Sequence, residues 1–399
     1  MLKSLIKHVL SMVSFNGKPV LMEAARSSVR KYFVVRRSLP GQFRVMRQRF
    51  AASGRLRMAG LNRSLGPARQ RLQGPYIFAR MQKLVSKRPL DLNIETTNFC
   101  AASCVFCPNS KVKRVKSMMD MELFKRLIHQ YAHIGGGALG ISSMQSDLFS
   151  DRHLLERLKY VRKFKNVIAP YSTTYLVGAS KFSDDDLKEI LGSLKYLQIS
   201  LGGTDRDSYR AMYGVNGFDT ARTQLLRIKR IVEENKLPIK LSLLFRTQSP
   251  DNILTSSLVE ELGPIFAIPE NRNTFFSWGG IISQSDLPAG AELVTLDNRE
   301  KRVDCAVAQA SMSIGTDGTV VGCGCVDWNA RHVVGNVEDK KITSIWQGKE
   351  AIDFRTAFSR GDIPDLCKDC SLYVPIDQSF SRLALRHYVP TDGLYYEQT

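Results

Sequence analysis

The chain has 399 residues, 43% of them hydrophobic, which is enough for two or three globular domains. Its formal net charge of +19 is carried by residues 1–90, which contain 20 Lys or Arg and one acidic residue, Glu23, so that residues 91–399 are neutral overall. No apolar run is long enough to span a membrane and no secretory signal is recognisable, which excludes an integral membrane protein and disfavours a secreted one.

Residues 1–90 are predicted to form a basic helical extension. In the segment LKSLIKHVLSMV (2–13), apolar residues fall on one helical face, and Lys3, Lys7 and His8 fall on the other. We expect contact with a membrane surface or a polyanionic substrate, because basic residues are attracted to anionic headgroups and an apolar face can insert among them. Nucleic acid is a weaker candidate, since the charges lack interleaved aromatic residues. Two alternatives for residues 1–90 stay open, namely a helical segment packed on the next domain and an organelle transit peptide. The expected location is the cytoplasm, with peripheral membrane attachment as an option.

From residue 91 onward, short apolar runs alternate with helical patterns. This alternation is typical of parallel βαβ units, and six such units predict an α/β fold, a partial (β/α)6 TIM-like barrel over residues 91–300. In such barrels the active site lies at the carboxyl ends of the strands. Ser183 is the predicted N-cap of one helix, because three acidic residues follow it. The predicted strands cover residues 92–97, 139–144, 167–174, 196–202, 239–246 and 274–280, and the clearest helices cover 119–134, 182–194 and 218–235.

The pattern changes after residue 300. The segment MSIGTDGTVVGCGC predicts a β-hairpin that turns at Asp317 and Gly318. Residues 344–358 read as a helix, and a loop with the sequence CKDC follows. We therefore expect a small α+β domain over residues 301–379 and a C-terminal tail over residues 380–399.

Three cysteines lie within eight residues just after the first predicted strand, at Cys100, Cys104 and Cys107. A structural zinc site takes four protein ligands, and a [4Fe–4S] cube usually takes four cysteinates. Three thiols would leave one iron open, and an open iron can bind a small molecule through an amine and a carboxylate. A zinc loop that takes its fourth ligand from elsewhere in the chain is the alternative.

The spacing C-x3-C-x-F-C after a first β-strand resembles the radical S-adenosylmethionine (SAM) superfamily. That resemblance implies an enzyme, an oxidoreductase, in which Cys100, Cys104 and Cys107 hold a [4Fe–4S] cluster. The open iron would bind SAM, and the reduced cluster would cleave it to a 5′-deoxyadenosyl radical. The resemblance also places Phe106 near the adenine.

Further contacts to SAM follow from the same resemblance. Gln145, Ser146 and Asp147 stand where the family usually has a Gly-Gly-Glu-Pro-like turn that contacts the SAM amino group, although both glycines are absent here. Ser200 would approach the ribose or the carboxylate, and Arg246 would meet the carboxylate. The alternatives are a helix-capping role for Asp147 and a surface position for Arg246.

The end of the sixth predicted strand carries Trp278, Gly279 and Gly280. Glycines at this place would let a ligand approach the backbone closely. A plain core position for Trp278 is the alternative.

The second cysteine group resembles the shortened "twitch" form of the SPASM auxiliary-cluster domain. By that resemblance an auxiliary [4Fe–4S] cluster is held by Cys305, Cys323, Cys367 and Cys370, and the cysteine count limits the domain to one cluster. Zinc in this four-cysteine site is the alternative. The sequence CGC allows either Cys323 or Cys325 to be the ligand, and we favour Cys323. Cys325 is then the surplus thiol; it is either a substrate-facing donor of a proton or hydrogen atom or a small buried hydrophobic residue.

A single auxiliary cluster is able to accept an electron, so the expected reaction is oxidation or epimerisation of a small polar metabolite such as a sugar or cyclitol. The expected partners are this small-molecule substrate and an external electron donor of the flavodoxin or ferredoxin type. The first alternative is a maturase of a ribosomally made peptide, although residues 1–90 show no strand triplet of a leader-binding segment. The second is a non-catalytic, metal-stabilised protein that binds nucleic acid.

Overall fold

The computed structural model describes residues 82–375 except 113, 143–145, 249–252, 269–272, 297–300 and 302. All of these residues belong to one compact unit that spans residues 74–399. The predictions for the basic extension up to residue 81 and for the tail 380–399 lie outside the described residues. Within the described part of the chain, no helix combines the length and the apolar character that a membrane crossing requires.

The centre of the described region is a nine-stranded sheet in the order β11-β10-β9-β1-β2-β3-β4-β5-β6. Strands β1 to β6 are parallel to one another, which confirms the predicted partial barrel of βαβ units. Their bounds are β1 (Asp91–Ile94), β2 (Gly137–Ile141), β3 (Val167–Thr174), β4 (Tyr196–Leu201), β5 (Lys240–Phe245) and β6 (Phe266–Ala267).

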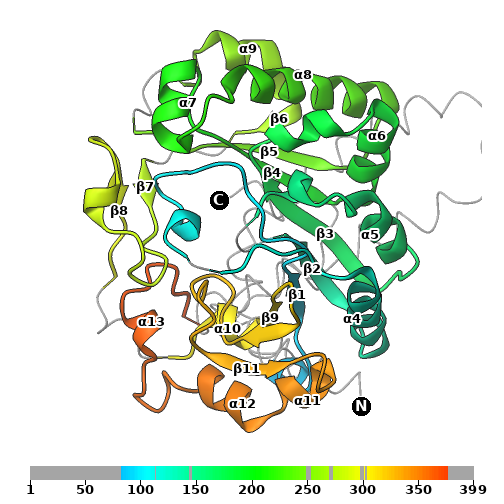
Figure 1. Ribbon diagram of the computed structural model, residues 1–399, viewed down its shortest axis with the longest axis vertical. Coiled ribbons are helices and arrows are strands. Elements are labelled where there is room, and N and C mark those ends of the chain that lie inside the picture. Colours follow the sequence, from blue (N-terminus) through cyan, green and yellow to red (C-terminus); the bar gives the residue numbers. More distant parts are fainter. Residues whose placement is uncertain are drawn as a thin grey trace, which may run out of the picture. The chain divides into compact units, whose positions relative to one another are not determined.

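Helices connect these strands and lie along the outer side of the sheet (Figure 1). The predicted N-cap is confirmed, because the Ser183 side chain accepts from the Asp186 amide and Asp186 bonds back in a capping box. The connecting helices are α4 (Met121–His133), α5 (Leu154–Val161), α6 (Asp184–Ser193), α7 (Arg206–Tyr213), α8 (Phe218–Asn235) and α9 (Ser257–Leu262).

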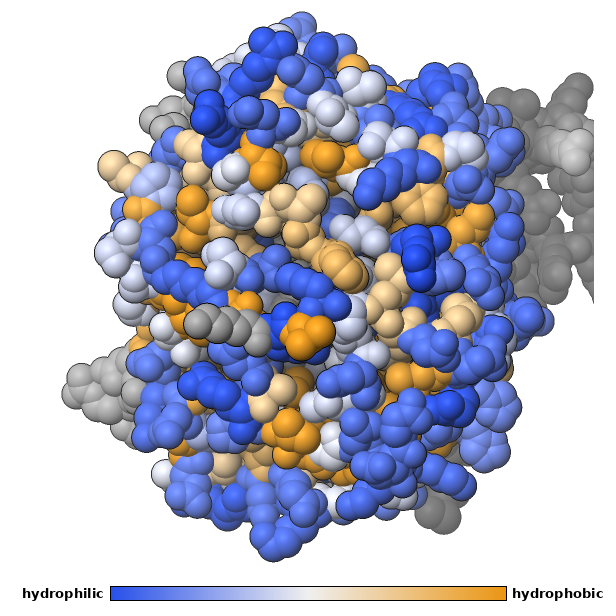
Figure 2. All heavy atoms as spheres, viewed as in Figure 1, coloured by the Kyte–Doolittle hydropathy of each residue, from blue (hydrophilic) through white to orange (hydrophobic). Residues whose placement is uncertain are grey.

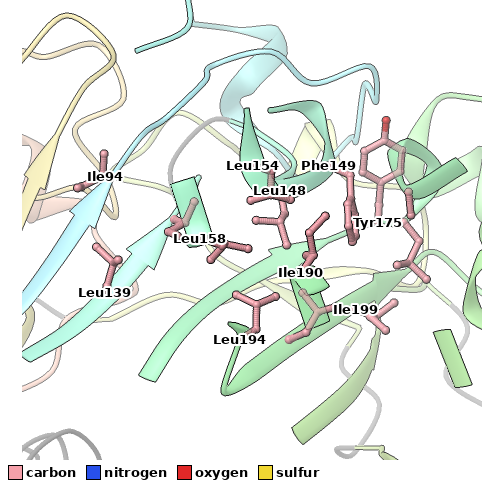
Figure 3. Packing of buried hydrophobic residues seen from close by; sticks show 14 of the residues in the cluster. Ile94, Leu139, Leu148, Phe149, Leu154, Leu158, Tyr175, Ile190, Leu194 and Ile199 are labelled. Atoms are coloured by element: carbon pink, nitrogen blue, oxygen red, sulfur yellow. The ribbon is translucent and has the colours of Figure 1, made fainter. Parts of the chain in front are cut away.

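The two faces of the sheet differ in chemistry. On the outer face, apolar strand residues such as Ile94 and Leu139 are fully buried in the layer that α5 and α6 cover, as Figure 3 shows. On the inner face, the Tyr171 hydroxyl donates to Asn93 Oδ1 at 2.9 Å, and Ser311 Oγ lies 3.1 Å from Asp91 Oδ2. The barrel therefore packs its core outward against helices and keeps polar groups on its concave side.

The prediction that residues 274–280 form the sixth strand of the barrel is wrong. The sixth strand of the main sheet is β6, whereas Thr274–Phe275 forms β7, which pairs with β8 (Glu292–Leu293) in a separate two-stranded sheet. The backbone explains the difference, because Trp278, Gly279 and Gly280 have φ values of 51°, 68° and 82°, which a strand cannot contain. These residues form a turn instead.

The C-terminal region continues the same sheet. Strand β9 (Ser311–Ile314) is parallel to β1, and it forms the predicted hairpin with β10 (Thr319–Val321), which turns at Gly318 with φ +81°. Strand β11 (Val333–Asn336) adds at the edge. The helix predicted over 344–358 is divided into two helices that meet near Gly348. The helices of this region are α10 (Ala306–Ala310), α11 (Ile342–Trp346), α12 (Lys349–Arg355) and α13 (Asp365–Lys368).

Candidate active site

The first cysteine loop follows β1 and is hydrogen-bonded to the end of α7. The Ser103 amide donates to the Tyr213 carbonyl and the Val105 amide donates to the Met212 carbonyl, both at 3.0 Å. Gly214 ends α7 with φ +66°, and a Cβ at this position would lie 2.7 Å from the Ser103 carbonyl oxygen. A glycine is therefore needed here both for the backbone conformation and for the close approach of the loop.

We expect the Gly214→Ala variant to be destabilised by about 1–3 kcal/mol and to retain less iron in the first site, because the new methyl group pushes the cysteine loop away. Gly361→Ala is the matched control, since Gly361 has φ +80° but nothing within 4 Å of an added Cβ. Chemical denaturation and iron analysis measure both effects. Equal iron retention in the two variants would show that the contact with Ser103 does not position the loop.

The other side of the loop is held by the segment after it. The Asn98 side-chain amide donates to the Val115 carbonyl at 2.8 Å, and the Ser117 amide donates to Asn98 Oδ1 at 2.7 Å. Deeper in the fold, Arg114 pairs at 2.8 Å with Glu95, whose side chain is fully buried. The cysteine loop is thus anchored on both sides by groups that do not involve its thiols.

Burial governs the thiols of this loop. It raises the pKa of Cys100 to about 12, and it raises the pKa of Cys104 and Cys107 as well. A thiol in this environment resists ionisation, so it is a poor nucleophile without a cation. Iron offsets this cost by binding the thiolate form. Three desolvated thiols on one short loop therefore suit cluster binding better than free-thiol catalysis.

Phe106 lies in an aromatic group beside the loop. Its ring stacks on Phe275 at 5.1 Å between centroids and meets Tyr213 edge-on at 5.7 Å. The Arg246 guanidinium, which follows β5, lies 5.5 Å from the Phe106 ring centroid. The Trp278 Nε1–H group donates to the Phe106 carbonyl at 2.9 Å. The structure therefore brings Arg246 and Phe106 together next to the cysteines.

Ser200, near the end of β4, is buried, and its Oγ accepts a hydrogen bond of 2.6 Å from the Tyr213 hydroxyl. Ser146 is half-buried after β2, and Gln145 lies outside the described residues. Asp147 is buried, and the Thr174 hydroxyl lies 2.7 Å from each of its carboxylate oxygens. Burial raises the pKa of Asp147 to about 7.

The raised pKa of Asp147 predicts a pH dependence of stability. The folded protein keeps this proton between roughly pH 4 and pH 7, whereas the unfolded chain has released it, so the free energy of unfolding falls as the pH rises through this window. Asp147→Asn has no carboxyl group to ionise. As the pH rises across this window, we expect the free energy of unfolding of this variant to increase relative to that of the wild type by up to about 1.4 kcal/mol per pH unit.

Denaturation of cluster-free protein without SAM, repeated across this pH range, measures the difference. Asp205→Asn is the control, and its stability relative to the wild type should change with pH in the opposite direction. The reason is that hydrogen bonds from the Ser208 backbone and side chain lower the pKa of Asp205. Parallel profiles for wild type and Asp147→Asn would contradict the expectation.

The second cysteine group surrounds a pocket in the C-terminal region. All five cysteines of this region contribute to the pocket wall, and the remaining wall is apolar or aromatic. Within the described residues, no three His, Cys, Asp or Glu side chains are arranged to hold a single metal ion. A cubane needs no such convergence, because it spreads its ligands over four irons. The apolar and aromatic wall residues are Val307, Ala308, Val326, Phe354, Phe358, Leu372 and Tyr373.

Electrostatic interactions distinguish Cys325 from Cys323. After burial, which is the main cause, Cys323 raises the pKa of Cys305, Cys367 and Cys370. Cys325 acts instead on Cys323, to which it is hydrogen-bonded, and on Tyr171 of β3, whose pKa is raised mainly by burial. Cys323 thus interacts with all four other thiols of the pocket, whereas Cys325 interacts with Cys323 and with Tyr171.

Contacts that the sequence did not reveal connect the two cysteine groups. The Trp278 ring lies 5.5 Å from the Trp328 ring, and the Trp328 Nε1–H group donates to the Cys325 carbonyl at 3.0 Å. Ser277 bonds to the loop that carries Cys370, through the carbonyl of Asp369. The only signal in the sequence is the pair of tryptophans themselves, which gives no hint that they touch.

Lys301 is a further residue whose role the sequence did not reveal. Only 2% of it is exposed, and its Nζ donates to the carbonyls of Cys367 at 2.8 Å and Lys368 at 2.6 Å. The buried ammonium group fixes the backbone of the CKDC loop. Its position four residues before Cys305 is the one feature of the sequence that could have drawn attention to it.

The C-terminal region matches a known protein family, and the chain is similar to a known protein over most of its length. Residues 305–371 match the SPASM family, described as an iron-sulfur cluster-binding domain, which confirms the predicted auxiliary-cluster domain. The PqqA peptide cyclase of Granulibacter bethesdensis is 20% identical over 312 residues, which cover 71% of this chain and 79% of that protein.

Two solved structures are also similar. BtrN in complex with AdoMet and 2-DOIA is 17% identical, with a TM-score of 0.48, over 71% of this chain and 93% of that one. Streptococcus suis SuiB bound to S-adenosylmethionine is 16% identical, with a TM-score of 0.49, over 81% of this chain and 83% of that one.

Proposed function

We propose that this chain, a radical SAM enzyme with a C-terminal SPASM domain, oxidatively modifies a ribosomally made peptide. The observation that carries the peptide substrate is the similarity to the PqqA peptide cyclase, which extends over 312 residues and thus beyond the SPASM region. This choice reverses the order expected from the sequence, where a small metabolite came first and a peptide second.

Cys100, Cys104 and Cys107 would hold the first cluster, and their desolvated thiols fit that role. When bound, a [4Fe–4S] cluster with SAM supplies reductive cleavage of SAM to a 5′-deoxyadenosyl radical. The backbone bonds to the end of α7 would keep the loop in place while SAM enters and leaves.

Four residues would orient SAM at this loop. Asp147 would accept the amino group, which would favour its ionised form despite burial. Arg246 would pair with the carboxylate, Ser200 would contact the ribose or the carboxylate, and Phe106 would lie near the adenine. Support for this set comes from the position of Arg246 beside Phe106 and from the hydrogen bond that holds Ser200.

In the second site, Cys305, Cys323, Cys367 and Cys370 would hold the auxiliary cluster, which when bound is able to take up an electron. Cys325 would face the substrate, because besides its hydrogen bond to Cys323 it interacts with Tyr171, whose hydroxyl donates to Asn93 on the inner face of the barrel. The polar groups of that face, among them Asn93 and Tyr171, suit a substrate rich in hydrogen-bonding groups.

A second candidate is oxidation or epimerisation of a small polar metabolite such as a sugar or cyclitol. It is favoured by the cysteine count, since one auxiliary cluster uses four of the five cysteines of the C-terminal region. The cysteine count limits the number of clusters but does not select a substrate, so we place the small metabolite second.

The test uses full-length protein with its clusters reconstituted, SAM and dithionite. Synthetic peptides encoded beside the gene are added in one series, and amino sugars and cyclitols in another. We expect 5′-deoxyadenosine in both series and the loss of two hydrogen atoms from a peptide in the first. Oxidation of a sugar with every peptide unchanged would favour the second candidate, and no 5′-deoxyadenosine under any condition would contradict both.

A further inference from the structure

We propose that the exposed rim of the first cysteine loop, formed by Phe99, Val115 and Lys116, is the docking surface for a small acidic electron-transfer protein. The inference rests on the proposed function, since the first cluster must receive an electron from outside before SAM is cleaved. It adds the place where the donor binds and the chemistry of the contact.

The rim is apolar and open to solvent. Val115 is 88% exposed and Phe99 is 44% exposed, and both are among the few exposed large hydrophobic residues of the described chain. Their backbones are held close together, because the side chain of Asn98, next to Phe99, donates to the Val115 carbonyl and accepts from the Ser117 amide. Figure 2 shows hydrophobic residues scattered among hydrophilic ones on the face where this loop lies, drawn in cyan in Figure 1.

The charge beside the rim is positive. The segment KVKRVK, residues 111–116, contains four basic residues and no acid. Arg114 is paired with the buried Glu95, and Lys111 is paired with Asp286. The Lys116 Nζ bonds to two neutral oxygens, the Asn98 carbonyl and Asn109 Oδ1, so within the described residues no carboxylate offsets its charge. An acidic partner would complement this surface.

The rim is also close to the candidate cluster. Phe99 directly precedes Cys100, and the Lys116 Nζ donates at 2.9 Å to the carbonyl of Asn98, two residues before Cys100. A donor that docks on the rim would therefore bring its own redox centre near the first cluster. Complexes for electron transfer need only small contact areas, which suits a rim of a few apolar residues next to positive charge.

The experiment uses three variants of one exposed position, Val115→Glu, Val115→Lys and the uncharged Val115→Gln. Each reconstituted protein is reduced anaerobically, either by a reduced acidic flavodoxin or by dithionite, which needs no docking surface. Bleaching of the cluster absorbance gives the rate. At low salt we expect reduction by flavodoxin to be slowed about threefold or more in the Glu variant, relative to Gln, and to be as fast or faster in the Lys variant.

Reduction by dithionite should be equal in all three variants, which shows that the fold and the clusters are intact. The proposal is overturned if the three variants accept electrons from flavodoxin at one rate, or if flavodoxin does not reduce a wild-type protein that dithionite reduces. In either case dithionite with SAM still yields 5′-deoxyadenosine if the proposed function is correct, so the two failures are distinguishable.

Discussion

Cys104→Ala protein is expected to form no 5′-deoxyadenosine above background and to hold about four irons per chain instead of about eight. Cys104 lies between the other two thiols of the loop in sequence, and burial and both neighbouring thiols raise its pKa. Its removal leaves two ligands, which do not hold a cubane, whereas the auxiliary site keeps all of its cysteines.

The fold should survive this substitution, because the loop is anchored through the backbone of Ser103 and Val105 and not through the thiols. Ser103→Ala is the matched control, since it changes the adjacent side chain and leaves that amide in place. Iron analysis, electron paramagnetic resonance and chromatography of the SAM products provide the measurements. Normal 5′-deoxyadenosine yield from Cys104→Ala would remove the basis for the first site.

Cys323→Ala and Cys325→Ala are expected to differ sharply although the two residues are separated by a single glycine. Cys323→Ala should fall to about four irons per chain, cleave SAM and fail to complete substrate oxidation. Cys325→Ala should keep about eight irons and cleave SAM, with the substrate released unfinished or altered. The expected difference follows from the interactions of the two thiols. Cys323 interacts with Cys305, Cys367 and Cys370, whereas Cys325 interacts with Cys323 and Tyr171.

The two variants control for each other, since both remove one thiol from the same loop. Iron content and the spectrum of the auxiliary cluster separate ligand loss from a defect in catalysis. A loss of iron from Cys325→Ala, with full iron in Cys323→Ala, would reverse the assignment of the ligand and of the substrate-facing thiol.

Much of the fold could be predicted because the signals are local. Strand β3 and helix α8 have the predicted bounds, since the apolar run that begins the strand and the amphipathic repeat of the helix are each visible within a short window. The sixth strand could not be found in this way. Strand β6 is two residues long and has no period to detect, while the aromatic run near Trp278 looks extended although its backbone turns into the left-handed region.

The candidate site shows the same limit. The cysteines are visible from spacing, whereas their supports are contacts between distant parts of the chain. The Trp278 bond to Phe106 joins residues 172 positions apart, and Thr174 reaches Asp147 across 27 positions. No pattern in either segment encodes the other. Such pairs emerge only when the chain folds and brings these distant segments together.

The pairing of β9 with β1 couples the unfolding of the two cysteine regions. Strand β1 is hydrogen-bonded to β2 on one side and to β9 on the other. Unfolding of the C-terminal region therefore removes the β9 hydrogen bonds from the strand that leads into the first cysteine loop. Calorimetry should then register one joint transition. Chimaeras that exchange the cluster-binding module must carry β1 and β9 from the same parent, because a mismatched pair leaves an open edge that invites aggregation.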